Sequence, residues 1–273
     1  MASKRRRVEL DVRLKMSLED TFKRELRSIF NTVRTEFMQS YIVTGDTQNI
    51  DKYRSSFESI LDNHYSRTTK AFMGSVANFN DVGLKRLSLF STKQDETDEE
   101  LLLAIMLQWR EREAPLTAEL LTETTRRNIQ DAIEQARNQL QDDGQEINNT
   151  NLGRSASAIM RRKFNARADF ISVSETQRAA EATKLTEAEI LSDLQPSVVG
   201  GFFLGTSETV KEWRTVGDRR VRDSHRQANG QRQRIDQPFV VQGQLLMHPG
   251  DRSLGATADN VANCRCSAIY VIQ

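Results

Sequence analysis

Proline and glycine are distributed very unevenly along this chain of 273 residues. No proline precedes Pro115, whereas three of the four prolines and eight of the thirteen glycines lie after residue 195. Proline breaks helices because it lacks a backbone N–H donor, and glycine weakens them through its backbone entropy. The sequence therefore predicts an α+β protein. Its N-terminal two-thirds should be mainly α-helical with long helices, followed by a small, loop-rich C-terminal module with short β-strands.

Apolar residues spaced three and four apart support this division. Such a stripe follows the capping signal at Ser17 and predicts a helix that ends near Gly45. A second helix should end near Gly74, and others are expected over residues 101–109, 115–143, 152–164 and 171–182, with Pro115 near a helix start. Short apolar runs predict strands at residues 198–204, 239–241, 245–247 and 267–272.

We expect three regions: a flexible basic N-terminal arm over residues 1–16, a helical region over residues 17–143, and a C-terminal domain over residues 144–273. The formal net charge of +1 provides no global attraction to nucleic acid. The arm, however, is locally basic. It could contact DNA phosphates without reading sequence, or stay solvated without a ligand. The residues concerned are Lys4, Arg5, Arg6 and Arg7.

Several classes of protein do not fit the sequence. No apolar run is long enough to span a bilayer, and no apolar segment follows the charged N-terminus, so we expect neither a membrane protein nor a signal peptide. The two cysteines are separated by one residue, and bridging them would require a strained ring, so free thiols are expected. A phosphate-binding glycine loop and a nucleophile elbow are absent from the sequence.

The last sixty residues carry an ordered set of motifs. A tryptophan precedes an Asp218-x-x-x-Arg222-x-x-His225 run, which is followed by a glycine turn, a Pro-Gly-Asp turn and a closing Asn-Cys-Arg-Cys segment. The motif residues outside that run are Trp213, Gly230, Pro249, Asp251, Asn263, Cys264, Arg265 and Cys266. This order resembles the C-terminal domain of the phage Mu F-like head-morphogenesis proteins, which are minor capsid proteins of tailed bacteriophages.

The resemblance implies a minor capsid or head-morphogenesis protein at the portal vertex or inner capsid. Such a protein would contribute to head assembly and to DNA packaging or ejection. It implies a virion component, present in the host cytoplasm during assembly, in several copies per virion. Its partners would be the portal protein, the major capsid or scaffold protein, and packaged double-stranded DNA bound non-specifically. Neither an enzyme nor a cofactor is expected. Only seven residues follow Cys266, so we do not expect the toxin domain that some relatives carry.

Two roles are open for the Asp218, Arg222 and His225 run. If the run is helical, these side chains share a face and could form a structural polar network. The resemblance extends to the segment ending at Glu175, which would then form a buried pair with Arg222. In the alternative, the protein is a metal-assisted nuclease or hydrolase acting on phage DNA, with His225 as general base and Asp218 as its orienting carboxylate. We expect the structural role, because no nucleophile or oxyanion donor is visible beside the run.

Four residues of the C-terminal module could bind zinc by their chemistry: His225, His248, Cys264 and Cys266. Many relatives carry a Cys-x-x-Cys pair where this chain has Arg222-Asp-Ser-His225. Arginine cannot coordinate zinc, so the sequence argues against a metal here. We expect instead that the two thiols pack beneath the last strand.

Overall fold

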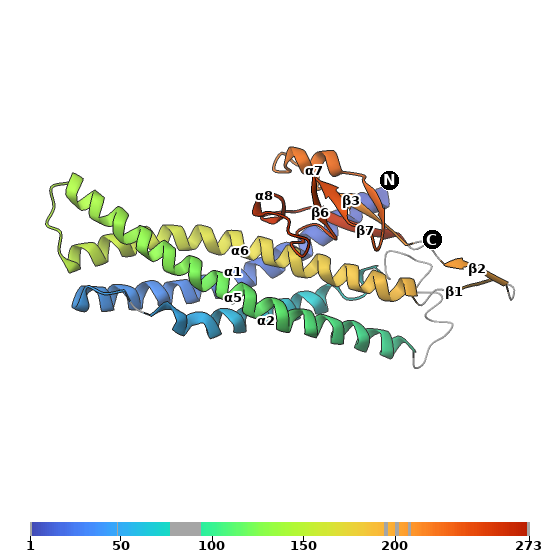
Figure 1. Ribbon diagram of the computed structural model, residues 1–273, viewed down its shortest axis with the longest axis horizontal. Coiled ribbons are helices and arrows are strands. Elements are labelled where there is room, and N and C mark those ends of the chain that lie inside the picture. Colours follow the sequence, from blue (N-terminus) through green and yellow to red (C-terminus); the bar gives the residue numbers. More distant parts are fainter. Residues whose placement is uncertain are drawn as a thin grey trace. The chain divides into compact units, whose positions relative to one another are not determined.

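The computed structural model describes the backbone of residues 2–47, 49–76, 94–193, 196–199, 202–206 and 209–271, and the side chains of residues 7–47, 49–76, 99–192 and 209–271. Its long helices are α1 (Ala2–Thr44), α2 (Arg54–Phe72), α5 (Gln94–Asp142) and α6 (Asn149–Asp193), with a 3₁₀ turn η1 (Ile50–Tyr53) before α2 (Figure 1). Short strands and the helices α7 (Asp223–Ala228) and α8 (Ala258–Val261) follow. The predicted α+β class is therefore confirmed.

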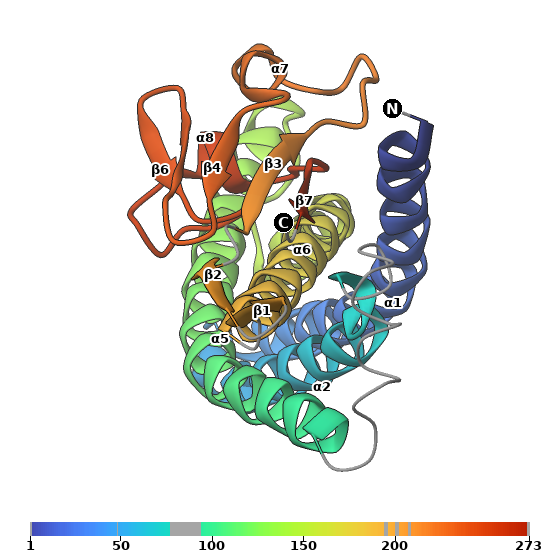
Figure 2. The same cartoon turned by 90° about the vertical axis from the view of Figure 1, so that its right-hand side faces the viewer.

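The strands among the described residues form three small antiparallel sheets. In the largest, β3 (Val210–Arg214) lies between β4 (Arg232–Arg234) and β7 (Ser267–Val271), as Figure 2 shows. A second sheet pairs β5 (Phe239–Val241) with β6 (Gln244–Leu246), close to the strands predicted at residues 239–241 and 245–247. The third pairs β1 (Pro196–Val199) with β2 (Phe202–Thr206).

The chain forms two compact units. The first, the module unit, comprises residues 1–19, 65–109 and 173–273. The second, the helical unit, comprises residues 20–64 and 110–172. Each long helix contributes residues to both units, so the boundaries expected at 16/17 and 143/144 do not coincide with the limits of these units.

The helical unit is a bundle built from segments of α1, α2, α5 and α6. Aromatic rings fill its centre: Phe30 lies 4.9 Å from Phe164 and 5.6 Å from Phe57, ring centre to ring centre. A polar contact joins α6 to α5, where the Arg167 guanidinium donates to Thr125 Oγ1 at 2.7 Å. The predicted apolar stripe of α1 faces this core, since Phe22, Leu26, Phe30, Val33 and Phe37 are all buried.

The module unit contains the sheets and the ends of the long helices. Its main apolar core surrounds the fully buried Trp213 and includes Phe239, Leu246 and Tyr270. A smaller cluster joins α5 to α6 through Leu102, Met106, Ala182 and Ile190.

Three expectations about helices are corrected. The arm predicted over residues 1–16 is helical from Ala2, and its buried face includes Val8 and Asp11. Pro115 lies inside α5 instead of at a helix start, between the buried Ala114 and Ala118, because packing of the neighbouring residues offsets the missing hydrogen bond. The helices predicted at 152–164 and 171–182 are one helix, since no proline or glycine interrupts residues 165–170.

Glycine marks the ends of helices as predicted. Gly144 follows α5 in the left-handed region at φ +63°, and the next N–H, from Gln145, donates to the Leu140 carbonyl at 2.8 Å. Among the described residues, no helix combines the length and the apolar character that crossing a membrane requires.

Candidate functional site in the C-terminal module

Both cysteine side chains point into the core of the module unit. Cys264 and Cys266 flank Arg265 immediately before β7, and in an extended segment alternate residues face the same side. Asn263 enters this segment in the left-handed region at φ +50°, and its N–H donates to Ser174 Oγ on α6 at 3.0 Å. The two thiols are therefore 1% and 2% exposed, whereas Arg265 points outward and forms an ion pair with Asp218.

His225 reaches the same place from α7. Its ring is 1% exposed and meets the Trp213 ring edge-on, with the ring centres 5.4 Å apart. Trp213 in turn meets Phe239 edge-on at 5.3 Å. Gly230, at φ +86°, donates its N–H to the Trp213 carbonyl at 2.8 Å and so closes the turn that returns the chain to β4.

The imidazole and the two thiols form one cluster. His225 Nδ1 lies 3.6 Å from Cys264 Sγ and 3.4 Å from Cys266 Sγ, and all three donor atoms lie within 4.8 Å of one another. His225 Nε2 is buried and has no hydrogen-bond partner among the described residues. The ring orientation therefore directs its one engaged nitrogen at the sulfur atoms.

The contact between the two thiols shifts their pKa values in opposite directions. The hydrogen bond from Cys266 holds the pKa of Cys264 well below its usual value, and the neighbouring His225 ring lowers it further against the effect of burial. The pKa of Cys266 is raised well above its usual value by the same contact and by burial. One thiolate is therefore stabilised within a buried cluster, which is the form in which sulfur binds metals and reacts.

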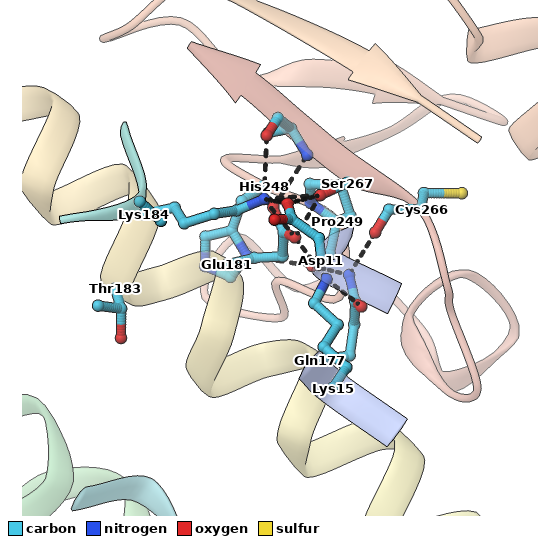
Figure 3. A network of polar contacts seen from close by, with 12 residues as sticks. Asp11, Lys15, Gln177, Glu181, Thr183, Lys184, His248, Pro249, Cys266 and Ser267 are labelled. Atoms are coloured by element: carbon cyan, nitrogen blue, oxygen red, sulfur yellow. Dashed lines mark hydrogen bonds and ion pairs between the residues drawn. The ribbon is translucent and has the colours of Figure 1, made fainter. Parts of the chain in front are cut away.

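A network of buried charges lies beside this cluster and joins α1, α6 and β7 (Figure 3). Lys184 Nζ lies 2.9 Å from Asp11 Oδ2 and 2.9 Å from Glu181 Oε1, and it also donates to Ser267 Oγ at 2.6 Å. Lys15 Nζ donates to Glu181 Oε1 at 2.6 Å. We call these five residues the charged network.

The charged network contains two carboxylates and two ammonium groups, so its charges balance. Burial raises the pKa of Asp11 and of Glu181, yet the nearby lysines outweigh it and hold both pKa values below their usual range. Burial lowers the pKa of Lys184, but Asp11 and Glu181 outweigh it and raise that pKa above its usual value. These three groups therefore stay ionised near neutral pH, with Lys15 as the second cation beside them.

The Glu181 carboxylate and the Gln177 amide connect α6 to the chain around β7. Glu181 Oε2 accepts from the Ala268 N–H at 2.9 Å, and Gln177 donates to the Cys266 carbonyl at 2.7 Å. Figure 3 shows that carbonyl turned toward Gln177 and the Cys266 sulfur turned away from it. The Pro249–Gly250 turn also packs on Gln177: a Cβ on Gly250 would lie 3.1 Å from Gln177 Cγ. Hydrogen bonds from α6 thus hold the backbone that carries the cysteines in place.

Comparison with known families identifies the strand-rich part of the module unit. Residues 204–269 match the family described as Phage Mu protein F like protein. The chain carries a Phage Mu protein F-like domain. This confirms the predicted resemblance over the matched residues. The match covers less than half of the chain. No curated protein and no solved structure matches it.

The predicted network of Glu175, Asp218, Arg222 and His225 does not form among the residues that the structure describes. Asp218 lies before α7, not in it, so the expected helical face does not exist. Asp218 pairs instead with Arg265, and Arg222 donates to the Ala262 carbonyl. In the part of the chain that the structure describes, no hydrogen bond or ion pair joins either residue to His225.

Glu175 is also paired differently from the prediction. Its carboxylate accepts from the Arg178 Nε at 2.9 Å and from the Tyr65 hydroxyl at 2.6 Å, so the partner is one turn along α6 instead of Arg222. Burial raises the pKa of Glu175, but Arg178 outweighs it and holds that pKa below its usual value. A partner three residues away on the same helix is positioned by the helix itself, whereas Arg222 would have to come from a distant loop.

His248 lies outside the thiol cluster. It is buried, its Nδ1 lies 3.2 Å from the Pro249 carbonyl, and burial lowers its pKa. Asp251 closes the same turn by accepting from the Met247 and Ser253 N–H groups, both at 2.8 Å. The structure therefore brings together three of the four predicted zinc ligands.

The basic N-terminal segment is described only in part. Residues 4–6 are helical, but their side chains lie outside the described residues. Arg7 is described: its Nε lies 3.1 Å from Asp11 Oδ1, and its Nη2 donates to the Ser75 carbonyl at 2.7 Å. Arg7 is thus engaged within the protein, and DNA contact by Lys4, Arg5 and Arg6 stays a prediction.

Sequence reasoning missed the charged network entirely. One signal for it was present in the sequence. Gln177, Glu181 and Lys184 recur at helical spacing on α6. The residues between them are rich in alanine, which is more typical of a buried helix than of a solvated one. Lys15 and Asp11 are likewise four residues apart on α1. The spacing identifies two polar faces, but it does not reveal that they meet.

Proposed function

We propose that this protein is a minor capsid protein of a tailed bacteriophage that acts at the portal vertex or inner capsid during head assembly and DNA packaging or ejection. The match of residues 204–269 to the Phage Mu protein F family carries this proposal. The portal vertex, the copy number and the passage of DNA are inferences from that family resemblance. In this proposal the domain binds neighbouring proteins and does not transform a substrate.

The interior of the domain supports a docking role. The charged network and Gln177 fix the backbone of β7 to α6. Such buried networks make an element rigid when every member is paired. A rigid module can present a surface to a partner without losing entropy on binding.

The β5–β6 hairpin supplies an apolar feature on the surface. Val240 and Leu245 are cross-strand partners, and they are 47% and 44% exposed. Directly paired residues of an antiparallel ladder project from the same face, so the two side chains form one apolar spot. Apolar groups at the centre of a protein interface contribute much of its binding energy. We assign this face of the hairpin to contact with portal or capsid protein.

The nuclease alternative requires a different geometry. A general base must reach a substrate and be oriented by a partner. His225 is 1% exposed, and its engaged nitrogen faces two thiols, while Asp218 binds Arg265. This arrangement does not favour His225 as a base acting on DNA.

Deleting the gene from the phage or prophage that carries it tests the function. We expect aberrant or non-infectious heads, rescue by the wild-type gene, and the protein in purified heads by quantitative mass spectrometry. Normal heads and full infectivity without the gene would contradict the proposal.

Substitutions in the hairpin test the docking face. A Val240→Glu/Leu245→Glu variant should remain folded by circular dichroism yet enter heads poorly. The control Gln227→Glu/Gln237→Glu adds the same charge at two exposed positions outside the hairpin strands and should enter heads normally. Equal incorporation of the two variants into heads would show that the hairpin is not part of the docking surface.

A nuclease assay separates the two functions. The purified chain, incubated with plasmid DNA and Mg²⁺, Mn²⁺ or Zn²⁺, should leave the DNA intact. Cleavage that His225→Gln abolishes would establish the alternative instead.

A further inference from the structure

The His225, Cys264 and Cys266 cluster has the composition and spacing of a metal site. Each residue offers one ligand atom, all three are buried, and the three atoms lie within 4.8 Å of one another. Thiolate and imidazole ligands together are typical of Zn²⁺, which takes sulfur at about 2.3 Å and nitrogen at about 2.0–2.1 Å. We infer that these three residues bind one Zn²⁺ ion. This inference concerns the ligands themselves and does not rest on the proposed function.

The distances suit a tetrahedral ion. With those bond lengths and tetrahedral angles, a nitrogen and a sulfur ligand should lie about 3.6 Å apart, and two sulfur ligands about 3.8 Å apart. His225 Nδ1 lies 3.4 Å and 3.6 Å from the two sulfur atoms. The sulfur atoms lie within 4.8 Å of each other, so metal binding requires them to approach by at most about 1 Å.

The charge of the site also fits. Binding requires both sulfur atoms as thiolates: Zn²⁺ forms two Zn–S bonds and one bond to a His225 ring nitrogen, and any proton still held by a thiol leaves to solvent. The product, two thiolates with one Zn²⁺, has no net charge. A buried cluster therefore gains strong bonds without leaving an uncompensated charge in the core.

The surrounding structure holds the ligands in place, as the residues behind a metal site commonly do. Gln177 fixes the Cys266 carbonyl, Asp218 holds Arg265 between the two cysteines, and the Trp213 ring packs against His225. Asp218 and Trp213 thus acquire positioning roles that the sequence motif did not reveal.

Three protein ligands leave a fourth position on a tetrahedral ion. In the described residues, the other metal-binding side chain predicted from the sequence, His248, lies outside the cluster. The inferred site therefore has three protein ligands among the described residues.

Metal binding by the full-length chain provides the test. The protein is purified with a phosphine reductant, stripped with a chelator and titrated with Zn²⁺ against a competing indicator. We expect one Zn²⁺ per chain. Substituted Co²⁺ should show visible absorption of a tetrahedral ion and thiolate-to-cobalt charge transfer.

Variants assign the ligands. Cys264→Ser and Cys266→Ser should each weaken Zn²⁺ binding more than the about 10–100-fold typical of losing a residue behind the ligands. His248→Gln is the matched control, because it removes a buried imidazole outside the cluster and should keep wild-type affinity. If the serine variants do not fold, the Co²⁺ spectrum of the wild-type chain decides. Cobalt bound without thiolate charge transfer, a Cys264–Cys266 disulfide formed in place of metal binding, or unchanged affinity in a folded serine variant would overturn the inference.

Discussion

Two charged residues one turn apart on α6 show how individual side chains stabilise the module unit. Glu181 and Lys184 are fully or almost fully buried, and each contacts both α1 and β7. A buried ion pair contributes little relative to apolar packing, but removing one member leaves the other charge uncompensated. The charged network is therefore sensitive to single substitutions.

Replacing Lys184 with methionine should destabilise the protein by about 3–5 kcal/mol, because Asp11 and Glu181 lose their shared cation while staying buried. The control Lys70→Met removes an exposed lysine and should change stability by less than about 0.5 kcal/mol. Urea unfolding followed by circular dichroism measures both. Equal midpoints for the two variants would show that the network contributes no specific stability.

The network also predicts the response to pH. The pKa values of Asp11 and Glu181 are lowered below their usual 3.8 and 4.5, so their stabilisation is complete above pH 4.5 and is lost as pH falls through the folded-state values. The raised pKa of Lys184 has the opposite sign: its stabilisation is complete below pH 10.5 and is lost as pH rises above the folded-state value. Urea midpoints measured across both ranges should form a plateau between them. A Glu181→Gln variant should show a smaller loss on the acid side than the wild type, and an identical acid slope would contradict this assignment.

At the scale of elements, turns place the strands against α6. Gly250 adopts φ +85°, and the Cβ of any other residue would lie 3.1 Å from Gln177 Cγ and 3.8 Å from the Arg178 nitrogen. The glycine therefore satisfies two requirements, a left-handed backbone and a close approach to the helix. Gly217 satisfies only the first, since a Cβ there would meet nothing within 4 Å.

These two glycines provide a matched pair of substitutions. Gly217→Ala should cost about 1–2 kcal/mol, the usual cost of a left-handed conformation for an alanine. Gly250→Ala should cost more, because Gln177 must also move and its hydrogen bond to the Cys266 carbonyl depends on its position. Thermal unfolding of both variants tests the difference. Equal costs would mean that the turn adapts freely to the added methyl group.

At the scale of the whole molecule, a near-zero net charge makes DNA binding a local property. Any attraction should come from short basic segments such as Lys4–Arg6, because the formal net charge is only +1. The family resemblance predicts non-specific DNA contact, and its strength should depend steeply on salt.

Replacing Lys4, Arg5 and Arg6 with alanine tests that DNA contact. If each residue binds one phosphate, the slope of log affinity against log salt should become shallower by about 0.9 for each phosphate that is no longer bound. A control replaces three exposed arginines of equal total charge on α5 and α6, Arg127, Arg161 and Arg162, and should change the slope less. Fluorescence anisotropy with a duplex DNA provides the measurement. Equal slopes for both triple variants would exclude a specific role for the N-terminal segment.

Much of the fold was predictable, because helix and strand patterns are local. The stripe of Phe22 to Phe37, the glycine that ends α5 and the β5–β6 pairing each follow from residues close together in the chain. The candidate site was predictable only in part. The motif pointed to His225 and the cysteines, but its Asp218 and Arg222 have other partners. The one-residue spacing of Cys264 and Cys266 shows that they share a face in an extended segment, and it does not show what they meet.

Short-range spacing and composition were enough to specify the helical and loop-rich regions. The order of the C-terminal motifs carried the family resemblance and pointed to the sulfur and imidazole groups of the candidate site. Which of those groups meet depends on the packing of distant segments. Lys184 and Asp11 are 173 residues apart, and Ser267 and Asp11 are 256 apart. Interactions between residues so far apart produce no periodic pattern in the sequence. They form because packing buries each charge beside an opposite charge that compensates it.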